Sequence, residues 1–207
     1  MLANILNRYF RNDANLALVL TVLFAFFYNS FFYDNYLPFT EGWFSLYADL
    51  MSRGLMPYRD FYLLLTPLYP KFIQLFSFIF GPEFLKLRIF GIFLFAFIAF
   101  LVFKICRIFI GPWKSFLIST ASITILESGN AFINYDYIYV YIFLNLIAIY
   151  CLLLAKINEN RTSFACLLLA SGFFASLSFL TKQSNVATLA DSVAYVGIVK
   201  VSNNVGA

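Results

Sequence analysis

The sequence contains no histidine. This absence excludes His-based catalytic triads, histidine metal sites and imidazole proton shuttles from the chain, so any acid–base chemistry falls to carboxylates, Lys or Tyr. Cysteine is scarce as well, and Cys106, Cys151 and Cys166 lie in apolar runs without CxxC spacing, which indicates small buried side chains. The sequence also lacks a glycine-rich phosphate-binding loop, which argues against a soluble nucleotide site.

Charged residues are also scarce. Only 12% of the 207 residues are charged, whereas 62% are hydrophobic and 21% are aromatic. A soluble domain carries about 25% charged residues and could not bury this much apolar area. The composition therefore indicates a protein whose solvent is lipid. The basic residues are scattered and form no stripe that could follow a nucleic acid, so we expect no nucleic-acid partner.

Apolar runs predict an all-α polytopic membrane protein with about six transmembrane helices, in a single membrane domain that covers residues 1–207. A helix needs roughly 20 residues to cross the hydrocarbon core, and several runs approach this length. The first run follows Arg8 and Arg11 and has no small-residue cleavage site after it, which is typical of an uncleaved anchor. The predicted spans are 15–33, 89–103, 115–133, 137–155, 164–180 and, more weakly, 185–199.

The segment 68–80 is apolar but short, and its orientation decides the topology. Lys71, Gln74 and Ser77 recur on one helical face opposite a set of aromatic and aliphatic residues, which is typical of a helix at the membrane interface. If it does not cross, eight of the 14 Lys and Arg residues are cytoplasmic; if it crosses, only five are. The positive-inside rule therefore favours an interfacial helix and a cytoplasmic N-terminus, and we expect a location in the bacterial cytoplasmic membrane.

In that topology the segment from about residue 34 to residue 88 forms a large outer loop. Thr40 is a predicted N-cap and Gly54 a predicted stop for a helix that lies on the membrane with Trp43, Phe44 and neighbouring apolar residues facing down. Glu41 falls in the first turn of this helix. Asp49 lies on its polar face, where solvation alone would explain it. Charged and aromatic groups gather in this loop, which makes it the candidate active site.

Other charged residues on this side of the membrane have two interpretations each. Arg59 pairs with Asp60 to stiffen a turn, or it contacts an anionic head group, with Tyr58 beside it. Arg88 opens the next span from the outer side, where lipid phosphate would balance its charge. Asp136 is either a charge at a helix N-terminus or a site residue, and Lys182 either snorkels to the interface or binds phosphate.

Four segments of this sequence together resemble the GT-C superfamily of membrane glycosyltransferases, closest to the glycosyltransferase-39-like branch of protein O-mannosyltransferases and aminoarabinose transferases. Each is a weak signal alone, and their order is what carries the resemblance, which covers residues 34–187. The segments are EGWFSLYADLMSRGLMPYRDF, TPLYPKFIQLFSFIFG, NYDYIYVYIFLNLIAIY and GFFASLSFLTKQSNVA.

The resemblance implies an enzyme that moves a hexose or pentose from a polyprenyl-phosphate donor to a lipid or envelope-glycan acceptor on the extracytoplasmic face, within a layer of membrane lipids. Glu41 matches the glutamate of the family's Asp-Glu pair, but Thr40 replaces the preceding Asp, so the base is Glu41 or Asp34. Asp136 matches a second outer-loop Asp that positions substrate or a metal. Arg88 and Lys182 match residues near the lipid phosphate. The resemblance implies no certain cofactor; a divalent metal is compatible with it, and the ligands of such a metal are unknown.

Two other interpretations remain open. A polytopic transporter half would place charged residues at mid-span depth along a path. A non-catalytic membrane subunit would share the apolar helices but lack a working catalytic pair. Family enzymes continue through further spans, so we also expect this chain to be an N-terminal part or a truncated form of such an enzyme.

Overall fold

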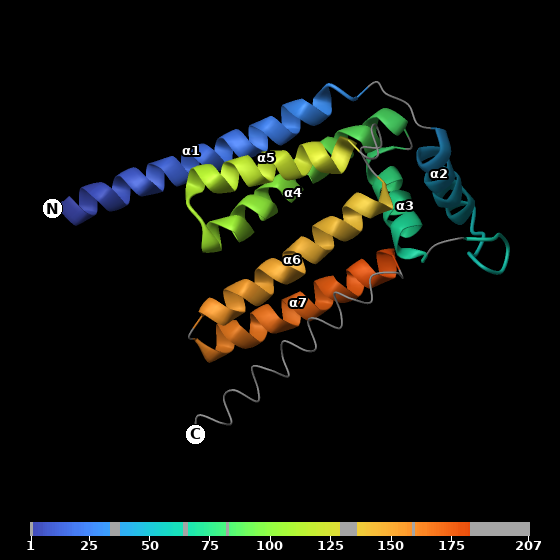
Figure 1. Ribbon diagram of the computed structural model, residues 1–207. Coiled ribbons are helices and arrows are strands. Elements are labelled where there is room, and N and C mark those ends of the chain that lie inside the picture. The colour runs from blue at the N-terminus through green and yellow to red at the C-terminus, as the bar shows by residue number, and fades with distance from the viewer. Residues whose placement is uncertain are drawn as a thin grey trace. The chain divides into compact units, whose positions relative to one another are not determined.

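The computed structural model describes residues 2–33, 38–63, 66–81, 83–128, 136–158 and 160–182. These ranges contain seven α-helices and no β-strand, which confirms the predicted all-α class (Figure 1). The helices are α1 Leu2–Ser30, α2 Pro38–Ser52, α3 Leu68–Phe80, α4 Phe84–Phe109, α5 Pro112–Ser128, α6 Tyr137–Ile157 and α7 Arg161–Thr181.

Four stretches within these helices are long and apolar enough to cross a bilayer: Asn12–Ser30, Leu85–Phe109, Tyr137–Ile157 and Thr162–Thr181. The described part of the chain is thus that of a helical membrane protein, but its span count differs from the predicted six. Helix α5 covers residues 115–128 of the predicted third span and has 17 residues, and residues 129–133 of that span lie outside the described ranges. The predicted sixth span, 185–199, lies outside the described residues. The second span is longer than predicted, because α4 continues past the charges of Lys104 and Arg107.

The chain groups into two compact units. The first comprises Met1–Trp43 and Phe76–Tyr139, and the second comprises Phe44–Leu75 and Val140–Ala207. In the first unit α1, α4 and α5 pack against one another in all three pairs. Helix α4 is more buried than α1: half of its apolar window is covered by protein, against 22% for α1.

Helix α1 buries small and polar side chains and exposes large apolar ones. Ala17, Thr21, Ala25 and Asn29 recur every four residues, and each is 0% exposed. Thr21 Oγ1 and Asn29 Nδ2 donate hydrogen bonds of 2.8 Å to the carbonyls four residues earlier, whereas Asn29 Oδ1 is buried without a hydrogen-bond partner among the described residues. The exposed side chains of the same helix are Leu16, Val19, Leu20, Leu23, Phe27 and Phe31. This arrangement is expected where lipid is the solvent and close helix packing requires small residues.

Helix α5 repeats this arrangement. Ser115 and Ser119 are fully buried, and each hydroxyl donates to the carbonyl four residues earlier, at 3.0 Å and 2.7 Å. Leu117 and Ile125 are exposed. The packing of the first unit therefore relies on small side chains that bring the backbones of α1 and α5 close together.

In the second unit α6 and α7 form an antiparallel pair (Figure 1). Ser171 Oγ donates to the Ala148 carbonyl at 2.9 Å, and Ser178 Oγ donates to the Tyr141 carbonyl at 3.2 Å. The two donors are seven residues apart on α7, and the two acceptors are seven residues apart on α6. The two hydrogen bonds are therefore separated by about two helical turns along the pair. Ala175 lies between the donors and is buried. Hydrogen bonds between helices in lipid commonly stabilise such a pair by about 0.6 kcal/mol each.

Helix α2 begins at Pro38, so the predicted N-cap at Thr40 was wrong: Thr40 already lies inside the first turn. Proline suits the first helical turn because its missing N–H would be unpaired there. The predicted stop at Gly54 is confirmed. Its φ of +84° is left-handed, and the bonds Gly54 N–H to Met51 O (3.0 Å) and Leu55 N–H to Leu50 O (3.2 Å) close the helix end.

The predicted bounds of the short helix are confirmed by α3, which ends at Phe80 and is followed by the left-handed Gly81 (φ +93°). Its 13 residues extend about 20 Å, short of the roughly 30 Å hydrocarbon core. The polar face is present, since Lys71 Nζ donates to Gln74 Oε1 at 3.2 Å. The predicted apolar face is only partly covered: Phe72 and Phe76 are half-buried, whereas Leu75 and Ile79 are exposed. The residues buried against protein are Tyr69 and Ile73, which were not predicted on that face.

Helix α2 is also only partly covered. Phe44, Ala48 and Met51 are buried, and the Phe44 ring meets the Tyr69 ring edge-on at 4.6 Å between centroids. Trp43 and Leu46, which were predicted on the same face, are about half exposed. Both short helices thus use one stripe for protein contacts and leave a second apolar stripe uncovered.

The two tryptophans of the chain can test whether α2 lies at the membrane interface. Trp43 on α2 is 50% exposed and Trp113 at the start of α5 is 45% exposed, and Trp is enriched at membrane–water interfaces. We expect Trp43 fluorescence in a Trp113→Phe variant to be quenched more by bromines near the lipid head group than by bromines near the chain ends. The Trp43→Phe variant, which isolates Trp113, is the matched control. Equal or absent quenching of Trp43 would contradict an interfacial α2.

Candidate functional site

The loop after α2 is held in one conformation by the carboxylate of Asp60. Arg59 binds this carboxylate with two atoms: Nε donates to Oδ1 at 2.9 Å and Nη2 donates to Oδ2 at 2.8 Å. The Met56 backbone N–H also donates to Oδ2, at 2.8 Å. In return, the Met56 carbonyl accepts from the Asp60 N–H at 2.9 Å. The interpretation in which Arg59 pairs with Asp60 to stiffen the turn is therefore the one observed.

Aromatic contacts anchor the same loop. The Phe61 ring stacks on Tyr47 of α2 with 5.7 Å between centroids and 15° between planes. The Tyr58 N–H donates to the Phe61 carbonyl at 2.9 Å, and Leu63 is buried. Tyr58 has a φ of +65°, a left-handed conformation that a bulky residue rarely adopts. Because such backbone strain persists only where neighbours enforce it, it marks the loop as a candidate functional element.

The Arg59 and Asp60 charges shift each other's protonation. The hydrogen bonds from Arg59 and then from the Met56 N–H lower the pKa of Asp60 from 3.8 to about 2. The bond to Asp60 raises the pKa of Arg59. Because the folded pKa of Asp60 lies below its ordinary value, the pair stabilises the loop fully above about pH 3.8. This contribution is lost as the pH falls through about 2.

Substituting Asp60 with Asn is expected to loosen this loop at neutral pH, since Asn cannot bind both the guanidinium and the Met56 N–H as an anion. Amide exchange in residues 55–61 should accelerate about tenfold, measured by hydrogen–deuterium exchange and mass spectrometry. Asp49→Asn is the matched control, because Asp49 makes only an exposed i,i+4 pair with Arg53 at 2.8 Å. Unchanged exchange in the Asp60 variant would show that the carboxylate does not hold the loop.

Arg88 lies near the start of α4 and is 6% exposed. Its Nη1 donates a hydrogen bond of 2.7 Å to the carbonyl oxygen of Tyr33, just beyond the end of α1. A cation next to the C-terminal carbonyls of a helix is favourable because those carbonyls carry partial negative charge. Arg88 therefore joins α4 to the end of α1, and it holds the residue that immediately precedes the candidate base Asp34.

Asp136 and Lys182 lie at helix ends, as predicted. Asp136 is 4% exposed, and its Oδ1 accepts from the Ile138 N–H at 2.9 Å at the start of α6. Of the two interpretations of Asp136, this contact is the one expected for a charge at a helix N-terminus. Lys182 caps the end of α7, where its N–H donates to the Ser178 carbonyl at 3.0 Å. Its Nζ lies 4.9 Å from the centroid of the Tyr141 ring, a cation–π contact.

The two candidate bases are only partly covered. Asp34 lies outside the described residues. Glu41 lies within α2, as predicted, but its side chain is not among those described. Tyr58, Arg59 and Lys182 belong to the second unit, whereas Arg88 and Asp136 belong to the first. Within the described ranges, no group of three His, Cys, Asp or Glu side chains is placed to hold a metal ion.

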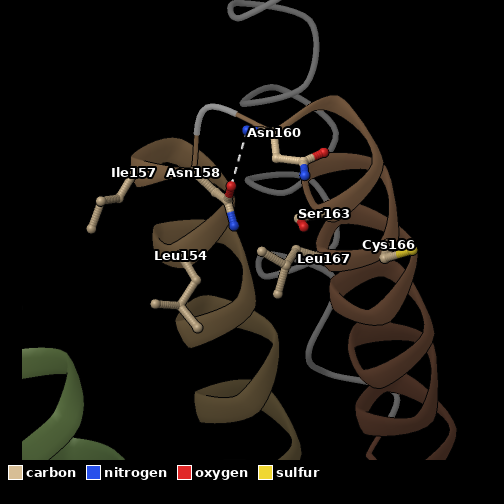
Figure 2. A pocket seen from close by; sticks show the side chains of 7 residues that line it. All are labelled: Leu154, Ile157, Asn158, Asn160, Ser163, Cys166 and Leu167. Carbon is tan, nitrogen blue, oxygen red and sulfur yellow. Dashed lines mark hydrogen bonds between the residues drawn. The ribbon is translucent and has the colours of Figure 1, made fainter.

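A pocket of about 860 Å³ opens at the turn between α6 and α7 (Figure 2). Its polar wall is already organised, because Asn158 Oδ1 accepts from the Asn160 N–H and Asn160 Oδ1 accepts from the Thr162 N–H, each at 3.0 Å. Asn160 is thereby the N-cap of α7. None of the predicted site residues lines this pocket, which is formed by Leu154, Ile157, Asn158, Asn160, Ser163, Cys166 and Leu167.

No family model matches the chain, and searches of curated proteins and of solved structures find no match either. The resemblance to GT-C glycosyltransferases therefore rests on the sequence segments quoted above, and the activity is a proposal.

Sequence reasoning missed three contributors to these sites. Tyr62 belongs to the loop after α2 and is 76% exposed. Its position four residues after Tyr58 was the sequence feature that could have indicated it. Tyr141 supplies the ring beneath Lys182, a pairing across 41 positions that no local pattern contains. The Tyr33 carbonyl that binds Arg88 is a backbone atom, and side-chain motifs carry no information about it.

Proposed function

We propose that this protein is a membrane glycosyltransferase that moves a monosaccharide from a polyprenyl-phosphate donor to a lipid or envelope-glycan hydroxyl on the extracytoplasmic face. The observation that carries the proposal is the distribution of charge along the helices. Charged groups occur near helix ends and in the loop after α2, whereas the apolar middles of the spans are uncharged in the described residues.

The chain's connectivity supports a common face for the predicted site residues. A common face requires a fifth crossing at α5, which the structure describes over 17 residues in addition to the four long spans. If α5 crosses together with α1, α4, α6 and α7 and the short α3 does not, the start of α4, the start of α6 and the end of α7 fall on one side. That side also receives α2 and the loop 53–63. Arg88, Asp136 and Lys182 would then share a membrane face with Glu41 and Arg59. A transporter half, in contrast, would require charges within the spans.

The proposed reaction is a direct displacement. The carboxylate of Glu41 or Asp34 takes the proton of the acceptor hydroxyl as its oxygen attacks the anomeric carbon. The bond from that carbon to the phosphate oxygen breaks, the bond pair leaves with the polyprenyl phosphate, and the configuration inverts. Negative charge grows on the leaving phosphate, which cationic groups at the interface stabilise.

The three predicted cations have different surroundings and therefore different roles in this proposal. Lys182 lies at a helix end with its ammonium over an aromatic face, an arrangement that keeps the charge near the interface. The charge of Arg59 is already balanced by Asp60, so in this proposal Arg59 contributes less to phosphate binding than Lys182 does. Arg88 is buried on the Tyr33 carbonyl and acts in this proposal as a positioning residue for the segment that begins at Asp34.

Transfer of radiolabel tests the proposal directly. The purified chain in lipid vesicles is supplied with polyprenyl-phosphate monosaccharides that carry a labelled sugar, together with an envelope lipid extract as acceptor. We expect label in the acceptor fraction, and none when nucleotide sugars replace the lipid-linked donors. If no lipid-linked sugar is transferred in vesicles that contain correctly folded protein, the proposed activity is refuted.

A further inference from the structure

We propose that Tyr58 and Tyr62 form a rigid aromatic platform that binds a pyranose ring of the acceptor, with the Arg59–Asp60 pair at its edge. This inference rests on the proposed function for the identity of the ligand, whereas the exposure of the two tyrosines and the hydrogen bonds of their loop are features of the structure. Tyr58 is 60% exposed and Tyr62 is 76% exposed, in a loop whose other aromatic residue, Phe61, is packed on Tyr47.

The alternation of side chains along the loop separates the two sides. Phe61 and Leu63 point toward protein, since the first stacks on Tyr47 and the second is buried. Tyr58 and Tyr62 remain on the outside. The Tyr58 N–H bond to the Phe61 carbonyl at 2.9 Å and the backbone bridge between Pro57 and Phe61 fold the loop so that Tyr58 lies next to the segment that carries Tyr62. Two exposed phenol side chains thus belong to one closed turn.

The rigidity of the loop favours a solute with a fixed shape over a fluid membrane surface. The loop is closed by the Schellman end of α2, by the three hydrogen bonds to the Asp60 carboxylate and by the Tyr58 N–H to Phe61 carbonyl bond. This network holds Tyr58 in a strained conformation. A bilayer adapts to any aromatic side chain at its surface and would not require this strain. A ring-shaped ligand benefits from it, because preorganisation lowers the entropy cost of binding.

The charge of the loop favours a neutral ligand. Arg59 and Asp60 neutralise each other with bonds of 2.8 Å and 2.9 Å. Two of the donor nitrogens of Arg59 are used in this pair, and its side chain is 67% exposed. A neutral ion pair beside two phenol groups supplies both donors and acceptors for hydroxyl groups, and the aromatic faces pack against the apolar face of a sugar ring. A phosphate dianion would instead meet the Asp60 carboxylate.

Saturation-transfer-difference NMR with neutral methyl pyranosides tests the platform on the whole chain in lipid nanodiscs. Tyr58→Asn removes the ring but tolerates the left-handed backbone, and Tyr62→Leu keeps apolar area without an aromatic face. We expect either change to weaken binding of at least one pyranoside about fivefold, whereas Tyr58→Phe binds like the wild type. Loop exchange rates must stay unchanged in each variant, which separates loss of the ring from loss of the fold.

Three outcomes would overturn the inference. These are no pyranoside signal with the wild type, wild-type binding by both Tyr58→Asn and Tyr62→Leu, or strong quenching of a Tyr58→Trp variant by head-group-proximal bromolipids, which would assign the loop to the membrane surface. A failure of the proposed function gives a different pattern. Pyranoside binding would then depend on both tyrosines while no polyprenyl-phosphate sugar is transferred.

Discussion

Replacing Glu41 with Gln is expected to slow sugar transfer at least about 100-fold, because the amide has nearly the same shape but cannot accept a proton from the acceptor hydroxyl. The Michaelis constant for the lipid-linked donor should change little, since the carboxylate acts on the acceptor. Initial rates of radiolabel transfer at saturating donor and acceptor measure the effect, and the thermal unfolding midpoint confirms that the variant is folded.

The arrangement of α2 supplies a matched control for this result. Asp49 lies two turns further along the same helix in an exposed pair with Arg53, so Asp49→Asn should retain the rate to within about twofold. The variant Asp34→Asn decides between the two candidate bases. A loss in Asp34→Asn with a normal rate in Glu41→Gln would assign the base to Asp34, and normal rates in both would refute a carboxylate base in this loop.

Replacing Ala25 with Leu is expected to destabilise the protein by about 1–3 kcal/mol, because the added side chain cannot enter a packed helix contact without moving it. Ala25 is 0% exposed on the small-residue stripe of α1, which packs on α4 and α5. Its carbonyl also accepts a 2.8 Å bond from Asn29 Nδ2, so a shift of α1 would disturb a buried polar group. The free energy of unfolding in mixed micelles, titrated with SDS, measures the loss.

Leu23→Phe is the control on the opposite face of the same helix. Leu23 is 44% exposed, and a larger apolar side chain there is accommodated by lipid, so the change should stay within about 0.5 kcal/mol. If Ala25→Leu were as stable as the wild type, the buried stripe would not be a close helix contact. An equal loss in both variants would show that the two faces of α1 are not distinguished by packing.

Much of the secondary structure followed from local chemistry. The helix 68–80 was predicted with its observed bounds, because prolines at its start and Gly81 at its end act within a few residues. Gly54 was predicted as a stop for the same reason, since a left-handed residue costs glycine little. The start of α2 was misplaced by three residues, because Pro38 begins a helix as readily as a polar cap does.

The contacts of the site residues were harder to predict from the sequence than the helices were. Arg59 has a partner at the next position, so the competing interpretations could be stated in advance, but only side-chain geometry distinguished them. Arg88 was interpreted as a phosphate ligand from its position at a span end. Its observed partner is a backbone carbonyl 55 residues away, and such an acceptor is present at every residue and leaves no pattern.

The sequence by itself determined that this chain folds into helices in lipid, because 62% hydrophobic content and a lack of charge leave no other solvent for its side chains. It also determined where the short helices stop. The tertiary structure decided which apolar stripe of each helix faces protein. Periodicity marks an apolar face, but it cannot distinguish burial against Ala and Ser from exposure to acyl chains. Helix contacts across the unit make that choice, since small residues admit a neighbouring backbone and large ones do not.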